Sequence, residues 1–140
     1  MSQYNIIDSP ARVWAFLREQ GVAVPVIGGM RALCLERDGQ LVMGVLYEGF
    51  NGVNVWMHVA LAPGARMTRK FLRYAFFYPF VALGCQRVSG YVEASNEKAR
   101  AFDEHIGFRQ EAVLKGAATD GGDVILYVMR REECRYVNSV

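Results

Sequence analysis

Apolar and polar residues alternate from Val53 to Leu61, which is the period of a β-strand with one apolar face. Trp56 and Ala60, on the opposite face of that strand, also favour burial. The pattern therefore predicts a central strand that is covered on both sides. Pro63-Gly64 should end this strand, and the segment 65–78 that follows has the spacing of a helix with one apolar face.

Turn-forming residues divide the chain before this strand into shorter elements. Ser9 and Pro10 are typical of a helix start, Gly21 of a helix end, and Asp38-Gly39 of a tight hairpin turn. The segment Val22–Met30 is interrupted by proline and glycine, so it predicts no regular element. The predicted elements are a strand over Tyr4–Ile7, a helix from Pro10 towards Gly21, and antiparallel strands over Arg31–Glu36 and Leu41–Tyr47.

The chain after residue 78 continues with a strand, a helix and two strands. Tyr78-Pro79 should kink or end the preceding helix, because proline removes a backbone donor. Ser95 or Asn96 can cap the next helix, and Gly107 should end it. The predicted elements are a strand over Val88–Glu93, a helix that turns Ala99, Phe102 and Ile106 inward, and strands over Ala112–Lys115 and Val124–Met129. This order indicates a single α+β domain over residues 1–140.

Four cations follow the central strand, namely Arg66, Arg69, Lys70 and Arg73. Their spacing of three and four residues predicts that they share one face of the following helix, close to its N-terminus. The helix dipole and the free N–H groups at that end attract anions, so a cluster of cations there indicates a bound phosphate. A solvated basic helix face is the alternative interpretation.

Composition and charge limit the remaining classes of function. With 140 residues, of which 52% are apolar and 21% charged, the chain has the composition of an ordinary globular domain. The formal net charge of +2 is too small to indicate a nucleic-acid partner, although the basic Arg66–Arg73 face keeps that as a third hypothesis. Cys34, Cys85 and Cys134 are far apart, so we expect buried thiols and no metal site. The apolar run Phe71–Leu83 is too short to span a membrane, so we expect a cytoplasmic protein.

The segment Asn96–Phe108 resembles the asparagine-led helix ending in Leu-Gly-Phe that marks the GNAT superfamily of acetyl-CoA-dependent N-acetyltransferases. The segment Tyr127–Glu133 is also similar to the closing strand of that family. The resemblance implies a mixed, mostly antiparallel central sheet of about six to seven strands flanked by helices. It also implies transfer of an acetyl group from acetyl-CoA to an amine of a small molecule or protein, by direct attack in a ternary complex, and it is compatible with a homodimer. A non-catalytic protein of the same fold, such as a binding or virion-type interaction protein, is the alternative.

The phosphate-binding loop of this family follows its fourth strand with the pattern V-x-P-x-x-R-G-x-G. Leu61, Pro63 and Arg66 match its first three fixed positions. Met67 and Arg69 replace its two glycines, which let backbone N–H groups approach the pyrophosphate. Side chains would therefore supply part of the phosphate binding that backbone N–H groups supply in the family.

Other residues are assigned to acetyl-CoA by the same resemblance. Asn96 matches the asparagine that contacts the pantetheine arm, although it can equally be a plain helix cap. Phe102 either lines the cofactor or packs in the core. The residues expected to contact acetyl-CoA are Val59, Leu61, Arg66, Thr68, Arg69, Lys70, Asn96 and Phe102.

Attack of a neutral amine on a thioester requires a group that removes a proton and a donor that stabilises the oxyanion. The family takes the oxyanion donor from a backbone N–H of its fourth strand, which corresponds here to Val59–Leu61. His58 lies next to that position and its imidazole titrates near neutral pH, so it is a candidate base, with Glu93 and Glu48 as alternatives. A structural histidine and surface carboxylates are the competing interpretations.

Asp103 occupies the position at which the family commonly has a tyrosine that protonates the leaving thiolate. An aspartate is ordinarily ionised at neutral pH and cannot donate a proton, so we expect Asp103 to lie on a solvated helix face without a role. The alternative is an Asp103 that is partly buried against Phe102 and the cofactor sulfur, with a raised pKa that keeps it protonated. The amine acceptor should bind beside loops of the fold. Val22–Met30 and Lys115–Asp123 are the two segments expected there.

Overall fold

The computed structural model describes residues 4–22 and 30–138. The strands are β1 (Tyr4–Ile7), β2 (Arg31–Arg37), β3 (Gln40–Glu48), β4 (Asn54–Leu61), β5 (Arg87–Glu93), β6 (Arg109–Leu114) and β7 (Val124–Arg130). The helices are α1 (Pro10–Glu19), α2 (Arg69–Phe77), α3 (Glu97–Ile106) and α4 (Arg135–Asn138), with a π-helical turn over Tyr78–Ala82 and a 3-10 turn over Arg131–Glu133.

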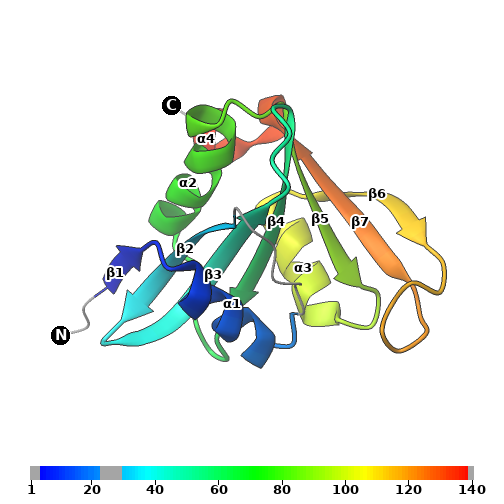
Figure 1. Cartoon of the computed structure of the whole chain (residues 1–140), viewed down its shortest axis with the longest axis horizontal. Coiled ribbons are helices and arrows are strands. Elements are labelled where there is room, and N and C mark those ends of the chain that lie inside the picture. Colours follow the sequence, from blue (N-terminus) through cyan, green and yellow to red (C-terminus); the bar gives the residue numbers. More distant parts are fainter. Residues whose placement is uncertain (1–3, 23–29, 139–140) are drawn as a thin grey trace.

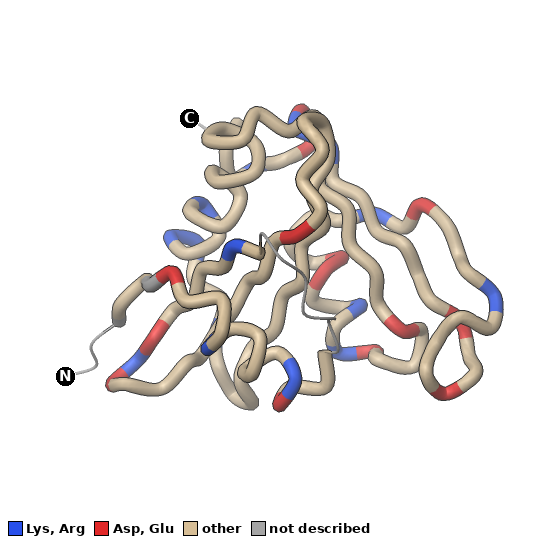
Figure 2. The backbone as a smooth tube through the Cα atoms, viewed as in Figure 1, with Lys and Arg blue, Asp and Glu red and all other residues tan. Residues whose placement is uncertain are grey.

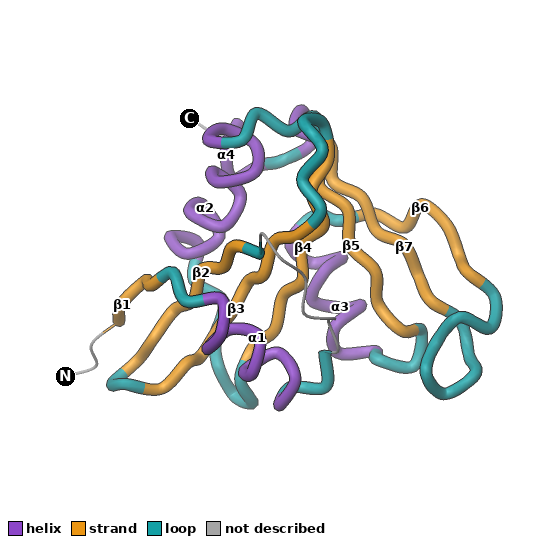
Figure 3. The backbone as a smooth tube through the Cα atoms, in the orientation of Figure 1, coloured by secondary structure: helices purple, strands orange, loops and turns teal. Residues whose placement is uncertain are grey.

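Within the described residues, the strands form one seven-stranded sheet in the order β1-β2-β3-β4-β5-β7-β6, flanked by helices (Figure 1, Figure 3). Neighbouring strands are antiparallel except β4 and β5, which are parallel. This arrangement confirms the predicted α+β fold class with a mixed, mostly antiparallel sheet. The segment 23–29, which includes most of the first expected acceptor loop, lies outside the described residues.

Local residues explain several element boundaries. Asp38 and Gly39 have φ values of 50° and 83°, which suits the predicted tight turn between β2 and β3. The side chain of Asn96 caps α3, and Gly107 ends that helix in the left-handed conformation with a φ of 115°. Pro79 follows the last residue of α2 by two positions, so that helix ends near the predicted point.

Several boundaries differ from the prediction, and β6 begins at Arg109, three residues before the predicted Ala112. The hydroxyl of Thr68 accepts a hydrogen bond from the Phe71 N–H at 3.2 Å, so Thr68 caps α2 and the helix begins at Arg69. Arg66 therefore lies in the preceding loop, and the prediction that all four cations share one helix face was wrong for Arg66. Val53 precedes β4 and is 52% exposed, because pairing with the neighbouring strands begins one residue later.

Both faces of β4 are covered, as its pattern predicts. On one face Phe16 and Leu17 of α1 pack against the sheet, and Gly44 lets this helix approach closely, because a Cβ there would lie 3.0 Å from Phe16 Cδ2. On the other face α2 packs with α4, and the ring of Phe76 stacks on that of Tyr136 with centroids 5.3 Å apart.

The strands β4 and β5 are paired over only part of their length. They pair over Asn54–Trp56 and Arg87–Ser89 and then diverge, with α3 beside the opening between them (Figure 1). Gly90 lies at the point of divergence, where a Cβ would be 3.3 Å from the carbonyl oxygen of Met57. On its other edge β4 stays paired with β3 as far as Leu61. One backbone edge in the second half of β4 therefore faces the opening.

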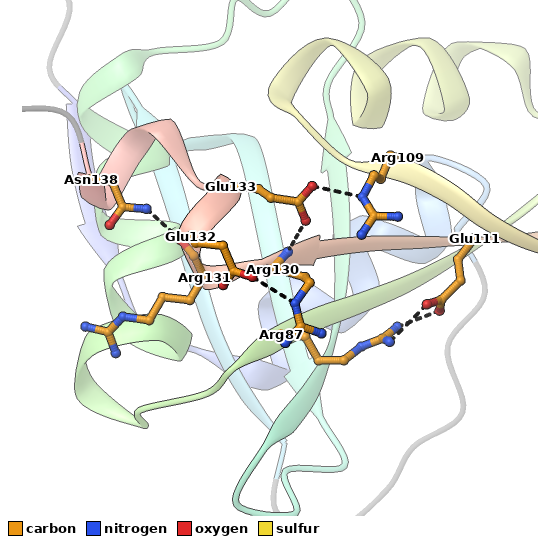
Figure 4. Close-up of polar contacts among 8 residues, drawn as sticks. All are labelled: Arg87, Arg109, Glu111, Arg130, Arg131, Glu132, Glu133 and Asn138. Carbon is orange, nitrogen blue, oxygen red and sulfur yellow. Dashed lines mark hydrogen bonds and ion pairs between the residues drawn. The ribbon is translucent and has the colours of Figure 1, made fainter.

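Charged side chains are paired with one another where β5, β6 and β7 begin or end (Figure 4). Arg87 donates two hydrogen bonds to Glu111, at 3.1 and 2.7 Å. Because such pairs are largely exposed and screened by solvent, they add little to stability, but each neutralises one arginine at this end of the sheet. The pairs are Arg87–Glu111, Arg109–Glu133 and Arg130–Glu132.

No helix in the described part of the chain is long and apolar enough to cross a membrane. Cys34, Cys85 and Cys134 are buried, as expected. Among residues 4–22 and 30–138, no group of three or more His, Cys, Asp or Glu side chains is arranged to hold a metal ion.

Candidate functional site

A groove lies where β4 and β5 diverge, between β4 and α3. Its larger pocket has a volume of about 270 Å3 and its smaller pocket about 60 Å3. Both are lined by Val22, Val59, Asn96 and Ala99, so together they form the β4–α3 groove. The larger pocket is also lined by Met57, His58, Tyr91, Glu93, Asp103 and Thr119, and the smaller one by Gln20, Ala60, Leu61, Lys98 and Phe102.

The backbone of β4 presents free hydrogen-bonding groups to this groove. The N–H of Ala62, just after the strand, donates to the Val42 carbonyl of β3 at 2.9 Å. Because backbone groups alternate sides along a strand, the N–H groups of Val59 and Leu61 point the other way, towards β5. The pairing of β4 with β5 has ended before these residues, so no strand lies beside them. They occupy the place in which an oxyanion donor is expected.

His58 is buried beside the larger pocket, with only 1% of its side chain exposed. Its Nε2 lies 3.5 Å from a carboxylate oxygen of Glu48, but it makes no hydrogen bond within the described part of the chain. Its ring meets that of Tyr91 edge to face, with centroids 4.9 Å apart. The imidazole is therefore held in place by packing, while one nitrogen stays available for proton exchange.

The two alternative bases lie in different surroundings. One carboxylate oxygen of Glu93 accepts a hydrogen bond from the Thr119 N–H at 2.6 Å, so Glu93 ties the groove to the β6–β7 loop. Glu48 is largely buried and approaches His58 from β3. Burial, and then the charge of Glu48, raise the pKa of Tyr91 above its usual value.

Asn96 can serve both as a helix cap and as a ligand contact, and Phe102 both packs in the core and lines the groove. The side-chain oxygen of Asn96 accepts a hydrogen bond from the Ala99 N–H at 3.1 Å, which caps α3. Its amide nitrogen keeps both donors and the residue lines both pockets, so capping does not exclude a contact with a ligand. Phe102 is half-buried against the core and also lines the smaller pocket.

The predicted phosphate-binding residues lie apart from the groove. Arg69 and Lys70 line a depression on α2 together with Arg73, Tyr74 and Phe77, and this depression shares no residue with the two pockets. Figure 2 shows the positive charges along α2. Within the described residues, none of these cations forms an ion pair with an acidic side chain.

Asp103 is placed differently from the sequence expectation. It lines the larger pocket and is only partly exposed, so the prediction of a solvated face was wrong. Burial, followed by the charge of Glu104, raises the pKa of Asp103 to about 7. The residue is therefore not fully ionised near neutral pH. Tertiary packing against β4 and β5 causes this change, and the helix sequence alone does not reveal it.

The sequence also missed two residues of the groove. Tyr91 lies two residues before Glu93 in β5, so strand alternation alone could have placed both on one face. Lys98 follows Asn96 by two positions and brings a cation to the smaller pocket. Of the second expected acceptor loop, Lys115–Asp123, the structure places Ala117 and Thr119 in the lining of the larger pocket.

Solved structures of spermidine N-acetyltransferases share this architecture over nearly the whole chain. A point mutant of SpeG from Vibrio cholerae matches with a TM-score of 0.75 and 16% identity, covering 97% of both chains. The chain has the GNAT fold. A chimera of Vibrio cholerae SpeG and hSSAT matches with a TM-score of 0.73 and 17% identity, covering 97% of this chain and 99% of the chimera. Another SpeG mutant gives a TM-score of 0.66 and 21% identity, covering 89% of this chain and 75% of the mutant.

The TM-scores show that the fold is shared, and identities this low extend the likeness to the fold alone. No protein-family model matches the sequence, and no curated protein matches it either. The function must therefore be argued from the groove itself.

Proposed function

We propose that this GNAT-fold protein is an N-acetyltransferase that transfers an acetyl group from acetyl-CoA to an amine of a small molecule. The observation that carries the proposal is the free backbone edge of β4 beside a buried histidine. The N–H groups of Val59 and Leu61 face the groove without a neighbouring strand, and His58 Nε2 lies at the same pocket without a hydrogen bond. One feature suits an oxyanion and the other suits removal of a proton.

The β4–α3 groove fits the elongated arm of acetyl-CoA, which supplies the activated thioester. Val59 and Leu61 would bind its amide and carbonyl groups through the backbone, as a paired strand would. Asn96 can donate from its free amide nitrogen, and Phe102 and Lys98 line the smaller pocket. The cations of α2 are the candidates for the phosphates, with the N–H groups of its first turn beside them.

The chemistry of the larger pocket favours a cationic acceptor. Glu93 and Asp103, which is partly ionised near neutral pH, are in its lining, and no Lys or Arg of the described residues is. A carboxylate-lined pocket attracts an amine that carries positive charge. The similar structures are of spermidine N-acetyltransferases, so spermidine is the first acceptor to test. A cytoplasmic location and a homodimer stay predictions from the sequence.

The first experiment tests acetyl-CoA as the co-substrate. At about 100 times its Kd, acetyl-CoA should stabilise the folded protein by about 2.7 kcal/mol and raise its melting temperature. Reversing Arg69 and Lys70 to Glu should abolish this rise while the free protein stays folded, since both side chains are exposed. Arg37→Glu reverses an exposed cation at the end of β2, away from α2, and is the control that should keep the rise. A wild-type protein that shows no rise contradicts the co-substrate assignment.

The second measurement tests turnover. The protein is mixed with acetyl-CoA and a panel of amines that includes spermidine, and the free thiol of CoA and the mass of the acetylated amine are measured. Release of one thiol for each acetylated amine supports the proposal. Binding of acetyl-CoA without thiol release on any amine would favour the alternative, a non-catalytic protein of this fold.

A further inference from the structure

We propose that Tyr127 is a positioning residue for acetyl-CoA binding: its hydroxyl anchors α3 to the sheet and so sets the width of the β4–α3 groove. This inference rests on the proposed function. Tyr127 lies in β7 and is fully buried. Its hydroxyl donates a hydrogen bond to a carboxylate oxygen of Glu104 at 2.7 Å and accepts one from Arg100 Nε at 3.4 Å. Both partners belong to α3, so one side chain of the sheet holds two residues of the helix.

The helix α3 is held less by apolar packing than α1 and α2 are. Within α3, which the structure describes throughout, Ile106 is the only buried side chain, whereas α1 buries three side chains and α2 four. Ile106 is also the last residue of α3, so it holds only the C-terminal end of the helix. The rest of α3 is held by the half-buried Phe102 and by polar contacts, among which those of Tyr127 come from the middle of the sheet.

The contacts of Tyr127 lie one residue away from the groove. Ala99 and Asp103 line the larger pocket. Arg100 and Glu104, which follow them directly in the chain, contact Tyr127. Residues four apart lie one above the other on a helix, so the two pairs form two adjacent rows. A shift of the row that Tyr127 holds therefore moves the row that lines the groove.

The anchor stands where the groove opens. Tyr127 is directly opposite Gly90 of β5, the residue at which β4 and β5 begin to diverge. Arg100 adds a second tie, because its guanidinium donates to the carbonyl oxygen of Ala94, just after β5, at 3.3 Å. Burial raises the pKa of Tyr127 above its usual value, so the hydroxyl keeps the proton that it donates to Glu104. These contacts tie α3 to β7 and to the end of β5.

The test compares Tyr127→Phe with the wild type. Removal of the hydroxyl should raise the Kd for acetyl-CoA about tenfold, the size expected for one hydrogen bond to a charged group. At saturating acetyl-CoA and amine, kcat should change by less than about twofold, because His58 lies on β4 and packs against Tyr91. Tyr47→Phe is the matched control. It removes another buried tyrosine hydroxyl, which donates to the Ala75 carbonyl of α2, and it should keep the wild-type Kd.

Replacements of Glu104 separate anchoring from a general loss of stability. Glu104→Gln keeps an oxygen that can accept from the Tyr127 hydroxyl, so its Kd should stay within about twofold of the wild type. Glu104→Leu removes the acceptor and should raise the Kd about tenfold, as Tyr127→Phe does. The double variant Tyr127→Phe with Glu104→Leu should bind no more weakly than either single variant, because all three lack the same contact. Additive losses in the double variant would overturn the proposal.

Amide hydrogen exchange follows the helix directly, in the protein without ligand. Tyr127→Phe should speed exchange over Glu97–Ile106 and leave α1 unchanged, because the hydroxyl contacts α3. An equal increase in both helices would show only a loss of overall stability and would count against the anchor. If the wild type binds acetyl-CoA and Tyr127→Phe binds it equally well, only the role of Tyr127 is refuted. If the wild type itself binds no acetyl-CoA, the proposed function fails, and the exchange data alone then support or refute Tyr127 as the anchor of α3.

Discussion

His58 carries a buried nitrogen that has no hydrogen-bond partner among residues 4–22 and 30–138, and such atoms are uncommon in folded proteins. Leaving a polar group of this kind unsatisfied costs about 1–3 kcal/mol. The nearby carboxylate of Glu48 offsets part of that cost at 3.5 Å, without occupying Nε2 in a hydrogen bond. A purely structural histidine would use both ring nitrogens, so this arrangement favours a role for His58 at the groove.

Replacing His58 with Gln should lower turnover about a hundredfold near neutral pH, because the amide cannot take up a proton. At high pH the amine is already neutral, so the difference from the wild type should shrink. Steady-state rates across the pH range measure this. Glu48→Gln is the control, since it removes the neighbouring charge and keeps the imidazole. If the pH–rate profile of the His58 variant has the wild-type shape, His58 is a structural residue.

The individual groove residues differ in how far the sequence could predict them. Asn96 follows from local rules, because a cap is defined by its own helix. The place of His58 beside the groove follows from strand alternation and the family resemblance. The protonation of Asp103 does not follow from the sequence in this way, because it depends on strands that are distant in the chain and lie opposite this face of the helix. Arg66 was misplaced because Thr68 caps the helix after it.

At the scale of elements, the groove exists because β4 and β5 separate. Their parallel pairing covers Asn54–Trp56 and Arg87–Ser89, and beyond it the edge of β4 is open. Gly90 sits where the two backbones still approach, at the base of the opening. A glycine in a strand often marks such a close approach. The width of the groove therefore depends on this contact.

Gly90→Val should destabilise the protein by roughly 1–3 kcal/mol, because a Cβ only 3.3 Å from the Met57 carbonyl oxygen forces β5 away from β4. The affinity for acetyl-CoA should fall as well, since the same shift moves the groove walls. Urea unfolding and a ligand titration measure the two effects. Ala112→Val adds bulk on the edge strand β6 and should change stability by less than about 0.5 kcal/mol. Equal stabilities of the two variants would show that Gly90 is not a point of close approach.

The elements themselves were largely predictable from the sequence. Periodicity and turn residues give the order of strands and helices, because each depends on neighbours in the chain. The divergence of β4 from β5 was not predictable in this way. The alternation of Asn54–Leu61 is the same whether a partner strand lies on one edge or two, so the open edge is a tertiary feature.

At the scale of the whole molecule, the formal net charge of +2 conceals an uneven distribution. At the shared end of β5, β6 and β7, three arginines are each paired with a glutamate (Figure 4). Along α2, the cations Arg69, Lys70 and Arg73 have no acidic partner in the described part of the chain (Figure 2). These three cations lie close together on one helix, an arrangement that suits a ligand with several phosphate charges.

This distribution predicts a strong effect of salt on acetyl-CoA binding. Raising NaCl from about 0.05 to about 0.5 M shortens the screening length to a few ångströms, so the Kd should rise roughly five- to tenfold. Replacing Arg69 and Lys70 with Gln should weaken binding at low salt and flatten the salt dependence. Glu111→Gln frees Arg87 at the far end of the sheet. Because Arg87 is not on α2, this variant should keep the wild-type affinity at low salt and the wild-type salt dependence. Titrations at several salt concentrations decide the matter. A salt dependence that persists in the α2 variant would place the phosphates elsewhere, and Lys98 of the smaller pocket would then be the residue to replace.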